Sequence, residues 1–537
     1  MAEVEAKDGF AVESGAASAD DSTTVVDSAG TVRAEYADDS RAILEEHGAG
    51  VPDLTPKTLR KLKNKLYLHI VVFFIFINLM LFIDKSAMSQ ASLLGVMEDT
   101  HMTSTQYNNL NTIFYTGYIV GQVPGNWLIQ RLPLRLFVAG SIFCWAVIEL
   151  LHCVALSYGR MIPLRFLLGI TEATVVPALE TTMSMFFTPE ELHTVQPLFW
   201  TSCVASPIPS GLVSYALLFS KSSVSPWKFY MIIVGSISLI LSGVSLLAYP
   251  SNPATAWFLT VDERVQTIRR VHAVTRSSIE TKRFRRYQFF EALRDPISWI
   301  FALSTFCLQL SNNLAFQLSL LYVALGVSDL GSTLVWVAAG GFALVVCVIA
   351  SFLLRWFPGY SAFWAALWTL PAIAGSIGMV ALPWDRTTPL LACLLLATNT
   401  WGMTYIITLA WTISSSAGHT KRLTRQGMFM AGYGISNIIS PQMWNDTSAA
   451  PRYYGTWVAQ IVLSFTVAPL LLILAWFILR RRNAARRVWI AEQHALGNTG
   501  EGFIESTAAD GSIVKTKVDV SMLDLTDLEN KFFIYPL

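Results

Sequence analysis

The stretch YLHIVVFFIFINLMLFIDKSAMSQ, residues 67–90, decides the fold. From Tyr67 to Ile83 it is almost wholly apolar, and a helical run of that length crosses about 30 Å of hydrocarbon. An acid and a base, Asp84 and Lys85, follow at once. A charge at the centre of a bilayer costs about 2.5–3.5 kcal/mol. The stretch therefore predicts a transmembrane helix that keeps a charged pair close to or inside the membrane.

Similar apolar runs recur along the 537 residues, of which 53% are hydrophobic and 14% charged. Soluble domains are nearer about 25% charged, so the chain is predicted to be a multi-pass membrane protein. We predict twelve spans, near 66–88, 106–130, 136–157, 160–182, 195–219, 228–249, 296–323, 331–355, 361–382, 388–412, 426–447 and 456–479. One long break after the sixth span indicates an all-α membrane protein built as two six-helix bundles.

The expected domains follow from these spans. They are a disordered acidic tail at 1–56, a six-helix bundle at 57–249, a linker with amphipathic helices at 250–295, a second bundle at 296–482 and a tail at 483–537. The linker sequence FRRYQFFEALRDPISW favours either a basic anchor on anionic lipid or a regulatory helix. Residues 1–56 show no basic segment followed by an apolar core, so no signal peptide is expected.

Lysine and arginine in the loops set the expected orientation. With both tails inside, the inner flanks hold about 25 of these bases and the outer loops hold Lys221, Lys228, Arg386 and Arg452. Basic residues concentrate in cytoplasmic loops, so both termini are predicted to be cytoplasmic. Asn445 opens a glycosylation sequon in an outer loop, close to a helix end.

Charges inside the spans mark the candidate site. In the fourth span, Arg165 and Glu172 are seven residues apart, and seven steps of 100° return within about 20° of the start. They should share one stripe of the helix, with Gly169 between them leaving room beside it. Intramembrane charges usually mark an ion or substrate pathway, although a set of internal salt bridges bracing two helices is the alternative. Glu149 and His152, one turn apart in the third span, favour a plain interhelical hydrogen bond.

The second half contains no obvious charge at membrane depth and offers amides and aromatic rings instead. We predict that the first half handles charge and that polar and aromatic side chains from several spans shape a substrate pocket. The candidates are Tyr115, Tyr118, Trp200, Asn312, Asn313, Asn399, Trp401 and Tyr405.

Other functions have little support in the composition. The net charge of +1 gives no field for nucleic acid. The six cysteines lie in apolar segments and show neither a disulfide framework nor metal-ligand spacing. An enzyme is disfavoured because no nucleophile–base arrangement is visible, and no cofactor or metal is expected.

Several motifs resemble the major facilitator superfamily, and within it the fungal allantoate permease family of anion:cation symporters. The resemblance covers about residues 57–537. It rests on FIDKS at 82–86, LRFLLGITEA at 164–173, EALRDPISW at 291–299, WTISSSAGHTKR at 411–422, GISNIISPQMW at 434–444 and DLTDLENKFFIYPL at 524–537. The family usually has arginine where this chain has Lys85, and lysine cannot form a bidentate fork on a carboxylate.

The resemblance implies the major facilitator fold, with two pseudo-symmetric bundles that rock about a central site. It implies proton coupling at Asp84 and Glu172, and contact with the substrate carboxylate at Lys85 and Arg165. The expected function is symport of a small organic anion, such as a ureide, vitamin or amino acid derivative, with protons across the plasma membrane, by a monomer. An exporter of a cell-made carboxylate or secondary metabolite and a non-transporting nutrient sensor remain as alternatives.

Overall fold

The structure is a computed structural model of the 537-residue chain. It describes residues 43–44, 46–47, 51, 55–279, 285–357, 360–444, 452–495, 501–507, 513–519 and 525–537. Most of the acidic segment at 1–56 and the sequon residue Asn445 lie outside the described residues.

The first half consists of helices that run back and forth along one axis. In chain order they are α2 (Pro56–Leu66), η2 (Tyr67–Val71), α3 (Val72–Leu93), α4 (Val96–Thr100), α5 (Ser104–Arg131), α6 (Leu134–His152), α7 (Tyr158–Glu172), α8 (Val175–Phe186), α9 (Pro189–Ala205), α10 (Pro207–Leu217) and α11 (Pro226–Ala248). The linker after α11 carries α12 (Val261–Ile279) and α13 (Arg286–Arg294).

The second half repeats this arrangement and ends in a short hairpin. Its elements are α14 (Pro296–Gln309), α15 (Asn313–Ala324), α16 (Asp329–Trp356), α17 (Ser361–Ala381), α18 (Thr387–Asn399), α19 (Gly402–Ser414), α20 (His419–Ile439), η3 (Ser440–Trp444), α22 (Tyr454–Ala459), η4 (Gln460–Val467), α23 (Ala468–Ala495), β1 (Glu501–Thr507) and β2 (Ile513–Asp519). The two strands pair antiparallel, and they were not predicted from the sequence.

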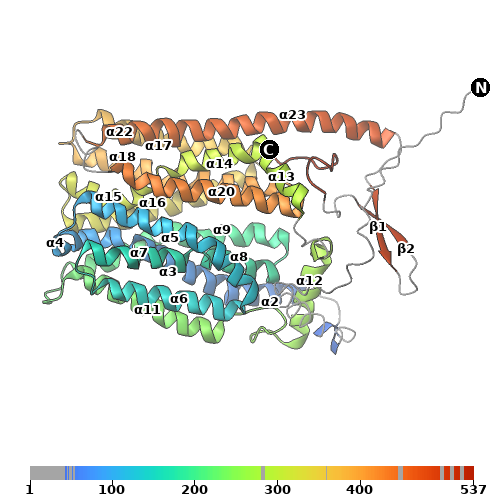
Figure 1. Ribbon diagram of the computed structural model, residues 1–537, viewed down its shortest axis with the longest axis horizontal. Coiled ribbons are helices and arrows are strands. Elements are labelled where there is room, and N and C mark those ends of the chain that lie inside the picture. Colours follow the sequence, from blue (N-terminus) through green and yellow to red (C-terminus); the bar gives the residue numbers. More distant parts are fainter. Residues whose placement is uncertain are drawn as a thin grey trace, which may run out of the picture.

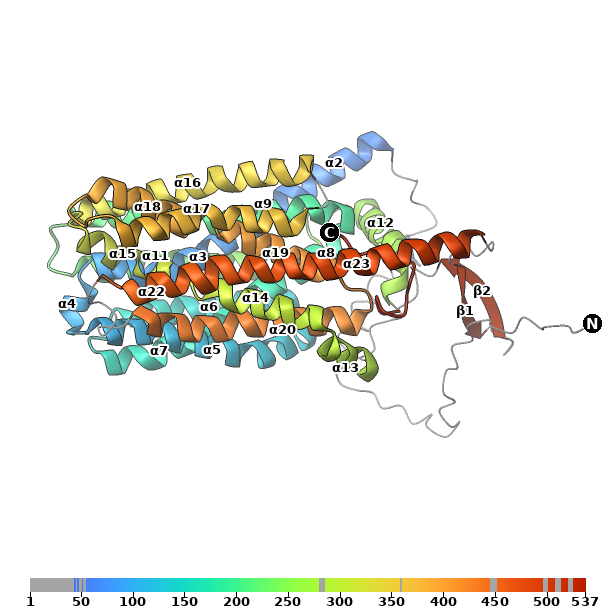
Figure 2. The ribbon, with the colours of Figure 1, turned by 90° about the horizontal axis from the view of Figure 1, so that it is seen from above.

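The helices lie side by side lengthwise, with α4 at one end and the linker helices α12 and α13 at the other (Figures 1 and 2). We call these the α4 end and the linker end. Continuous or briefly broken helices form six rods in each half, which matches the predicted six-plus-six order. The rods are α2–η2–α3, α5, α6, α7–α8, α9–α10 and α11, then α14–α15, α16, α17, α18–α19, α20–η3 and α22–η4–α23.

Eight of these rods are long and apolar enough to cross a membrane, counted over the described residues. The other four have identifiable reasons to fall short. The α9–α10 and α14–α15 rods carry buried polar side chains beside their breaks at Ser206 and at residues 310–312, such as Ser210 and Asn313. The α5 and α20 rods are unbroken but carry many polar side chains, such as Asn108 and Arg425. Polar faces of this kind belong inside a bundle rather than against lipid.

Close packing between α5 and α7 explains the glycine in the candidate stripe. A Cβ on Gly169 would lie 2.0 Å from the carbonyl oxygen of Phe114, and one on Gly117 would lie 2.1 Å from that of Phe166. Both glycines therefore allow two backbones to touch. The space that was predicted beside Gly169 is filled by the backbone of α5.

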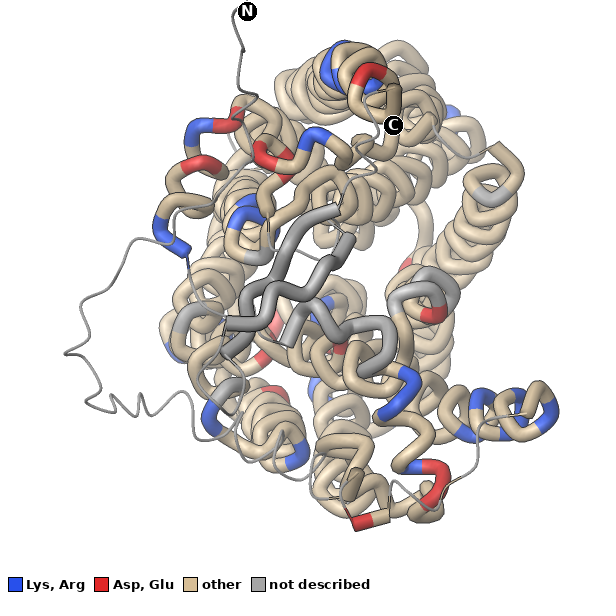
Figure 3. The backbone as a smooth tube through the Cα atoms, turned by 90° about the vertical axis from the view of Figure 1, so that its right-hand side faces the viewer, with Lys and Arg blue, Asp and Glu red and all other residues tan. Residues whose placement is uncertain are grey.

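The linker end gathers charged residues around the ends of the helices, as Figure 3 shows by looking onto it. The linker helix α12 is held to the first half because Arg270 Nη1 lies 2.7 Å from Glu191 Oε1 and Lys65 Nζ lies 2.7 Å from Glu263 Oε2. Helix α13 instead packs on α14 and α20 of the second half. The linker thus contacts both bundles.

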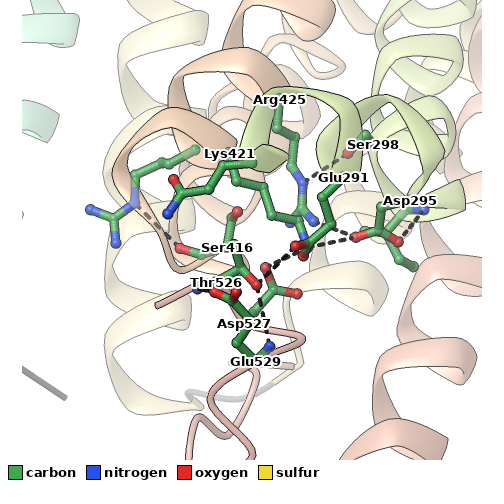
Figure 4. A network of polar contacts seen from close by, with 12 residues as sticks. Glu291, Asp295, Ser298, Ser416, Lys421, Arg425, Thr526, Asp527 and Glu529 are labelled. Carbon is green, nitrogen blue, oxygen red and sulfur yellow. Dashed lines mark hydrogen bonds and ion pairs between the residues drawn. The ribbon is translucent and has the colours of Figure 1, made fainter. Parts of the chain in front are cut away.

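A buried ionic network ties α13, α14, α20 and the last described segment together (Figure 4). Asp295, which caps α14, lies 2.8 Å from Arg425 Nη2 and 3.1 Å from Arg482 Nη2. Lys421 Nζ lies 2.8 Å from both Glu291 Oε1 and Asp527 Oδ1. Burial alone would raise the pKa of Asp295, but Arg425, Lys421 and Arg482 outweigh it and hold that pKa below its ordinary value.

The segment 525–537 packs onto the second half as part of its core. Tyr535 is buried, and its hydroxyl donates to Asp527 Oδ2 at 2.7 Å. Asn483 of α23 bonds both backbone groups of Tyr535, each at 2.9 Å. Trp411 Nε1 donates to the carbonyl oxygen of Pro536 at 2.8 Å. The polar network thus continues into the end of the chain.

Candidate functional site

The intramembrane charges predicted from the sequence come together in the first half. Asp84 on α3 is 0% exposed. On α7, Arg165 is 3% exposed and Glu172 is 1% exposed. Arg165, Gly169 and Glu172 lie on the buried stripe of α7, as their spacing indicates. Lys85 is half-buried and points elsewhere, toward α5.

The acids of this cluster lie next to one another. The Asp84 carboxyl is close to those of Glu172 and Glu149, so a hydrogen bond can form once one member of a pair carries a proton. Among the described residues, none of the six carboxyl oxygens of these acids has a hydrogen-bond donor. Two carboxylates can only accept hydrogen bonds, so this arrangement is complete only with a proton between them.

The bases do not neutralise these acids by direct contact. No N···O distance within 4.0 Å joins Lys85 or Arg165 to an acid of the described structure, and Nε and Nη2 of Arg165 are buried there without a partner. Arg165 is nevertheless within electrostatic range of Asp84 and Glu149. The bracing alternative needs closed salt bridges between α3 and α7, and the described residues do not form them.

His152 makes its hydrogen bond within its own helix and not to a neighbouring helix. Nδ1 of His152 lies 2.8 Å from the carbonyl oxygen of Ile148 on its own helix, and 3.9 Å from Glu149 Oε2. Both residues are 0% exposed, and Glu149 extends the acid pair into a group of three. The sequence does not say which neighbouring helix faces Glu149, so its proximity to Asp84 of α3 was not predicted.

Lys85 lies beside a group of aromatic rings between the halves, at the place of the predicted substrate pocket. Its Nζ lies 5.1 Å from the centre of the Tyr118 ring and 5.0 Å from that of Phe82. Tyr115 and Tyr118 on α5 both lie within 6.4 Å of Tyr433 on α20, whose ring centre is 5.8 Å from that of Tyr405. A cation beside several aromatic faces is a favourable arrangement and leaves the ammonium available to an anion.

Amides line the same pocket from the second half. Asn312 Nδ2 donates to Tyr115 Oη at 3.1 Å and to Asn437 Oδ1 at 2.5 Å. Tyr433 and Asn437 were not predicted from the sequence, although the polar spacing in GYGISN of α20 is a signal that could have identified them. Among the other predicted pocket residues, Trp200 packs on Phe82 with ring centres 6.3 Å apart, and Trp401 packs in an apolar cluster beside Tyr405.

Two predicted pocket residues are already engaged elsewhere. Asn399 Nδ2 donates to the carbonyl oxygen of Leu395 on its own helix at 3.0 Å. Asn313 Oδ1 accepts from Asn111 Nδ2 at 2.6 Å, a contact that joins the two halves. Asn313 therefore belongs with the contacts that close the pocket.

The two halves are closed against each other at the α4 end. Tyr107 stacks on Phe316 with ring centres 4.5 Å apart, and Ser89 and Ser319 lie 3.0 Å apart. Gln317 donates to Asn108 Oδ1. On α5, the described hydrogen bonds to the second half involve residues 107–115 and none closer to the linker end. The pocket is thus sealed from the α4 end.

Known proteins share this sequence and fold over most of their length. A family model for the Major Facilitator Superfamily matches residues 70–441. The chain is 48% identical over 487 residues to an uncharacterised transporter of Schizosaccharomyces pombe, covering 90% of this chain and 85% of that one. It is 44% identical over 512 residues to a high affinity cysteine transporter of Saccharomyces cerevisiae, covering 94% and 96%.

A solved structure agrees with the fold. A bacterial homologue of the human lysosomal transporter Spinster, inward-facing and unoccupied, superposes with a TM-score of 0.59 at 14% identity, covering 76% of this chain and 96% of that one. The predicted fold class is confirmed. The narrower resemblance is supported only distantly, since the allantoate permease of Saccharomyces cerevisiae is 25% identical over 499 residues, covering 90% of this chain and 88% of that one.

The matched family covers most of the chain, and its fold is the one that carries the buried charge cluster and the pocket between two bundles. This chain is a member of the Major Facilitator Superfamily of secondary transporters.

Proposed function

We propose that the protein is a symporter that moves a small organic anion together with protons. Asp84 and Glu172 carry the protons, and Lys85 and Arg165 hold the substrate carboxylate. The observation that supports this most is the buried pair of facing carboxyls without a donor. Such a pair is stable when it holds a proton, and it becomes strongly unfavourable when both members are ionised.

The charges give a physical reason for coupling. Two acids and two bases lie at similar depth, so the site is close to neutral when no proton and no substrate are bound. An added anion introduces a negative charge that must be balanced before the site can close, and a proton on Asp84 or Glu172 balances it. Binding the anion together with the proton keeps the net charge of the buried site small. A small net charge favours the rearrangement between the two access states.

The predicted pocket contains side chains that can bind a small carboxylate. Lys85 is half-buried beside Tyr115 and Tyr118, and Asn312 places an amide across from them. Tyr405, Trp200 and Trp401 complete the apolar wall, and Asn313 and Asn399 support the helices that carry it.

The relatives suggest which carboxylate to try first. Because a relative that is 44% identical is named as a cysteine transporter, we propose a small amino acid or amino acid derivative as the substrate class. Its carboxylate would bind Lys85 and Arg165, and its ammonium group would lie against the tyrosine faces. We further propose that the protein acts as a monomer in the plasma membrane with both termini in the cytoplasm.

The test uses purified protein in liposomes. An inward proton gradient should drive accumulation of labelled cysteine, or of another small carboxylate from a panel, above its external concentration. Dissipating the gradient with a protonophore should abolish this accumulation. Equal uptake with and without the gradient would contradict proton coupling, and net efflux driven by protons moving inward would identify an exporter instead.

A further inference from the structure

Glu149 is a buried titratable group that the proposed mechanism does not use. It lies on α6 with 0% exposure, and neither carboxyl oxygen has a donor among the described residues. His152, one turn away, is equally buried, and its Nε2 has no partner there. A buried acid without a hydrogen-bond donor and a buried imidazole nitrogen without a partner are costly to keep in an apolar interior. We therefore expect Glu149 and His152 to have a function.

These groups form a series that leads from the α4 end toward the middle of the first half. His152 is the last residue of α6, at the α4 end. Glu149 lies one turn deeper and adjoins Asp84 of α3, which in turn adjoins Glu172 at the end of α7. Neighbouring members are close enough for a proton to pass directly or through one water.

The series is separate from the substrate pocket. Asp84 and Lys85 are adjacent in the chain, so their side chains diverge by about 100° around α3. Asp84 is 0% exposed and faces α6 and α7, whereas Lys85 is half-buried and faces the tyrosines of α5. A proton could therefore reach Asp84 without passing through the pocket that the substrate fills.

Two bases provide countercharge to this series. Arg165 of α7 is within electrostatic range of Asp84, Glu149 and His152. Tyr230 of α11 and Cys153, the residue after α6, also face Glu149 and are neutral near pH 7. Lys85 is the other base near Asp84. With Arg165 as countercharge, the acids of the series can together carry one negative charge. Each proton transfer moves that charge from one acid to another.

We propose that Glu149 is an additional proton carrier, which passes protons between the α4 end of the first half and Asp84 by a path separate from the substrate pocket. In each step the O–H bond of protonated Glu149 breaks as an oxygen of ionised Asp84 accepts the proton. The carboxylate left on Glu149 is then reprotonated from water at the α4 end, past His152, whose Nδ1 lies 3.9 Å from Glu149 Oε2. The proposal rests on the proposed proton symport.

The experiment compares Glu149→Gln, Glu149→Asp and the matched control Glu98→Gln in liposomes. Glu98 is an exposed acid at the same end, on α4. The initial rate of proton-driven uptake is measured beside exchange of labelled for unlabelled substrate at equal pH. Exchange needs no net proton movement and reports a folded carrier with an intact pocket.

Glu149→Gln should slow proton-driven uptake by about a hundredfold, the low end of what a positioned proton donor contributes. Exchange and the final accumulation ratio should stay at the wild-type level, because Asp84 and Glu172 still set the coupling. Glu149→Asp keeps a displaced carboxyl and should give an intermediate uptake rate with wild-type exchange. Glu98→Gln should behave as wild type.

Wild-type uptake rates in Glu149→Gln would overturn the relay while leaving proton symport intact. Loss of exchange together with uptake in both Glu149 variants would show that the residue braces α3 against α6 instead. Should Glu149→Gln fail to fold, Glu149→Asp decides, since wild-type uptake there contradicts the proposal. If the wild-type protein shows no proton-driven accumulation, the proposed function fails, and the relay fails with it.

Discussion

Asp84 and Lys85 are neighbours in sequence, yet each belongs to a different part of the site. Asp84 adjoins Glu172 and Glu149 inside the first half, and Lys85 borders the aromatic pocket. No ion pair holds Asp84 and Lys85 to each other in the described structure. In the proposed mechanism, proton and substrate would therefore act on adjacent residues of α3 without competing for the same atoms.

At the residue scale, Glu172→Gln should uncouple transport from protons. The amide keeps the size of the protonated acid but cannot release a proton. The variant should bind substrate and exchange it at near wild-type rates, while losing accumulation under a proton gradient. Liposomes assayed in both modes measure this, with Glu98→Gln as control. Proton-driven accumulation at the wild-type level would remove Glu172 from the mechanism and leave Asp84 and Glu149 as the candidate carriers.

Arg165→Lys should weaken substrate binding, because a planar fork with two parallel donors becomes a single point charge. We expect the half-saturation concentration to rise about tenfold or more, which corresponds to about 1.4 kcal/mol. Arg160→Lys is the matched control, since Arg160 lies on the same helix but is exposed. Unchanged half-saturation would mean that Arg165 serves structure alone.

At the scale of elements, the linker end behaves as one ionic unit, in which α13, α14, α20 and the segment 525–537 share buried charges. Removing one partner from such a network leaves an uncompensated charge in an apolar environment, which costs more than the pair itself contributes. The network should accordingly control the stability of the second half.

Asp295→Asn should lower thermal stability at neutral pH by the equivalent of about 3 kcal/mol, because Arg425 loses its carboxylate. The pKa of Asp295 is lowered in the folded protein, so its contribution is present above the unfolded pKa of about 3.9 and is lost as the pH falls further. The gap in melting temperature between wild type and variant should narrow below about pH 4. Asp385→Asn, at an exposed loop, is the control, and a constant gap would contradict the assignment.

Tyr535→Phe should destabilise the second half by about 1.5–3 kcal/mol, since its hydroxyl bonds charged groups. The hydroxyl donates to Asp527 at 2.7 Å and accepts from Arg486 Nη2 at 3.0 Å. The control is Tyr360→Phe, which removes the same hydroxyl oxygen from a side chain that is 55% exposed and lies outside the network. Thermal unfolding of both variants gives the comparison, and equal melting temperatures would show that the Tyr535 hydroxyl adds no stability.

At the scale of the whole molecule, six rods in each half give an even number, so both ends of the chain should lie on one side of the membrane. The loop charges predict that this side is the cytoplasm. An epitope tag at residue 1 or 537 should therefore be hidden from antibody on intact cells and become reachable after permeabilisation. A tag in the 220–225 loop serves as the outer control. Labelling of either terminal tag on intact cells would reject the orientation.

The sequence by itself determined the features that arise from periodicity and composition. Runs of apolar residues predicted the membrane rods, and a seven-residue spacing put Arg165 and Glu172 on one buried stripe of α7. These features depend only on the geometry of a single helix and on the cost of charge in hydrocarbon. Tyr115, Tyr118 and Asn312 were found by the same reasoning, because polar groups in a span seldom face lipid.

Only the tertiary structure decided which helices face each other. Rotation and tilt of a helix depend on close contacts such as Gly169 against Phe114, and no local pattern reveals the partner. Thus Glu149 meets Asp84, Tyr433 and Asn437 enter the pocket, and segment 525–537 joins the network at Asp295. Each of these contacts joins residues far apart in the chain, and their energy exists only once the helices have packed.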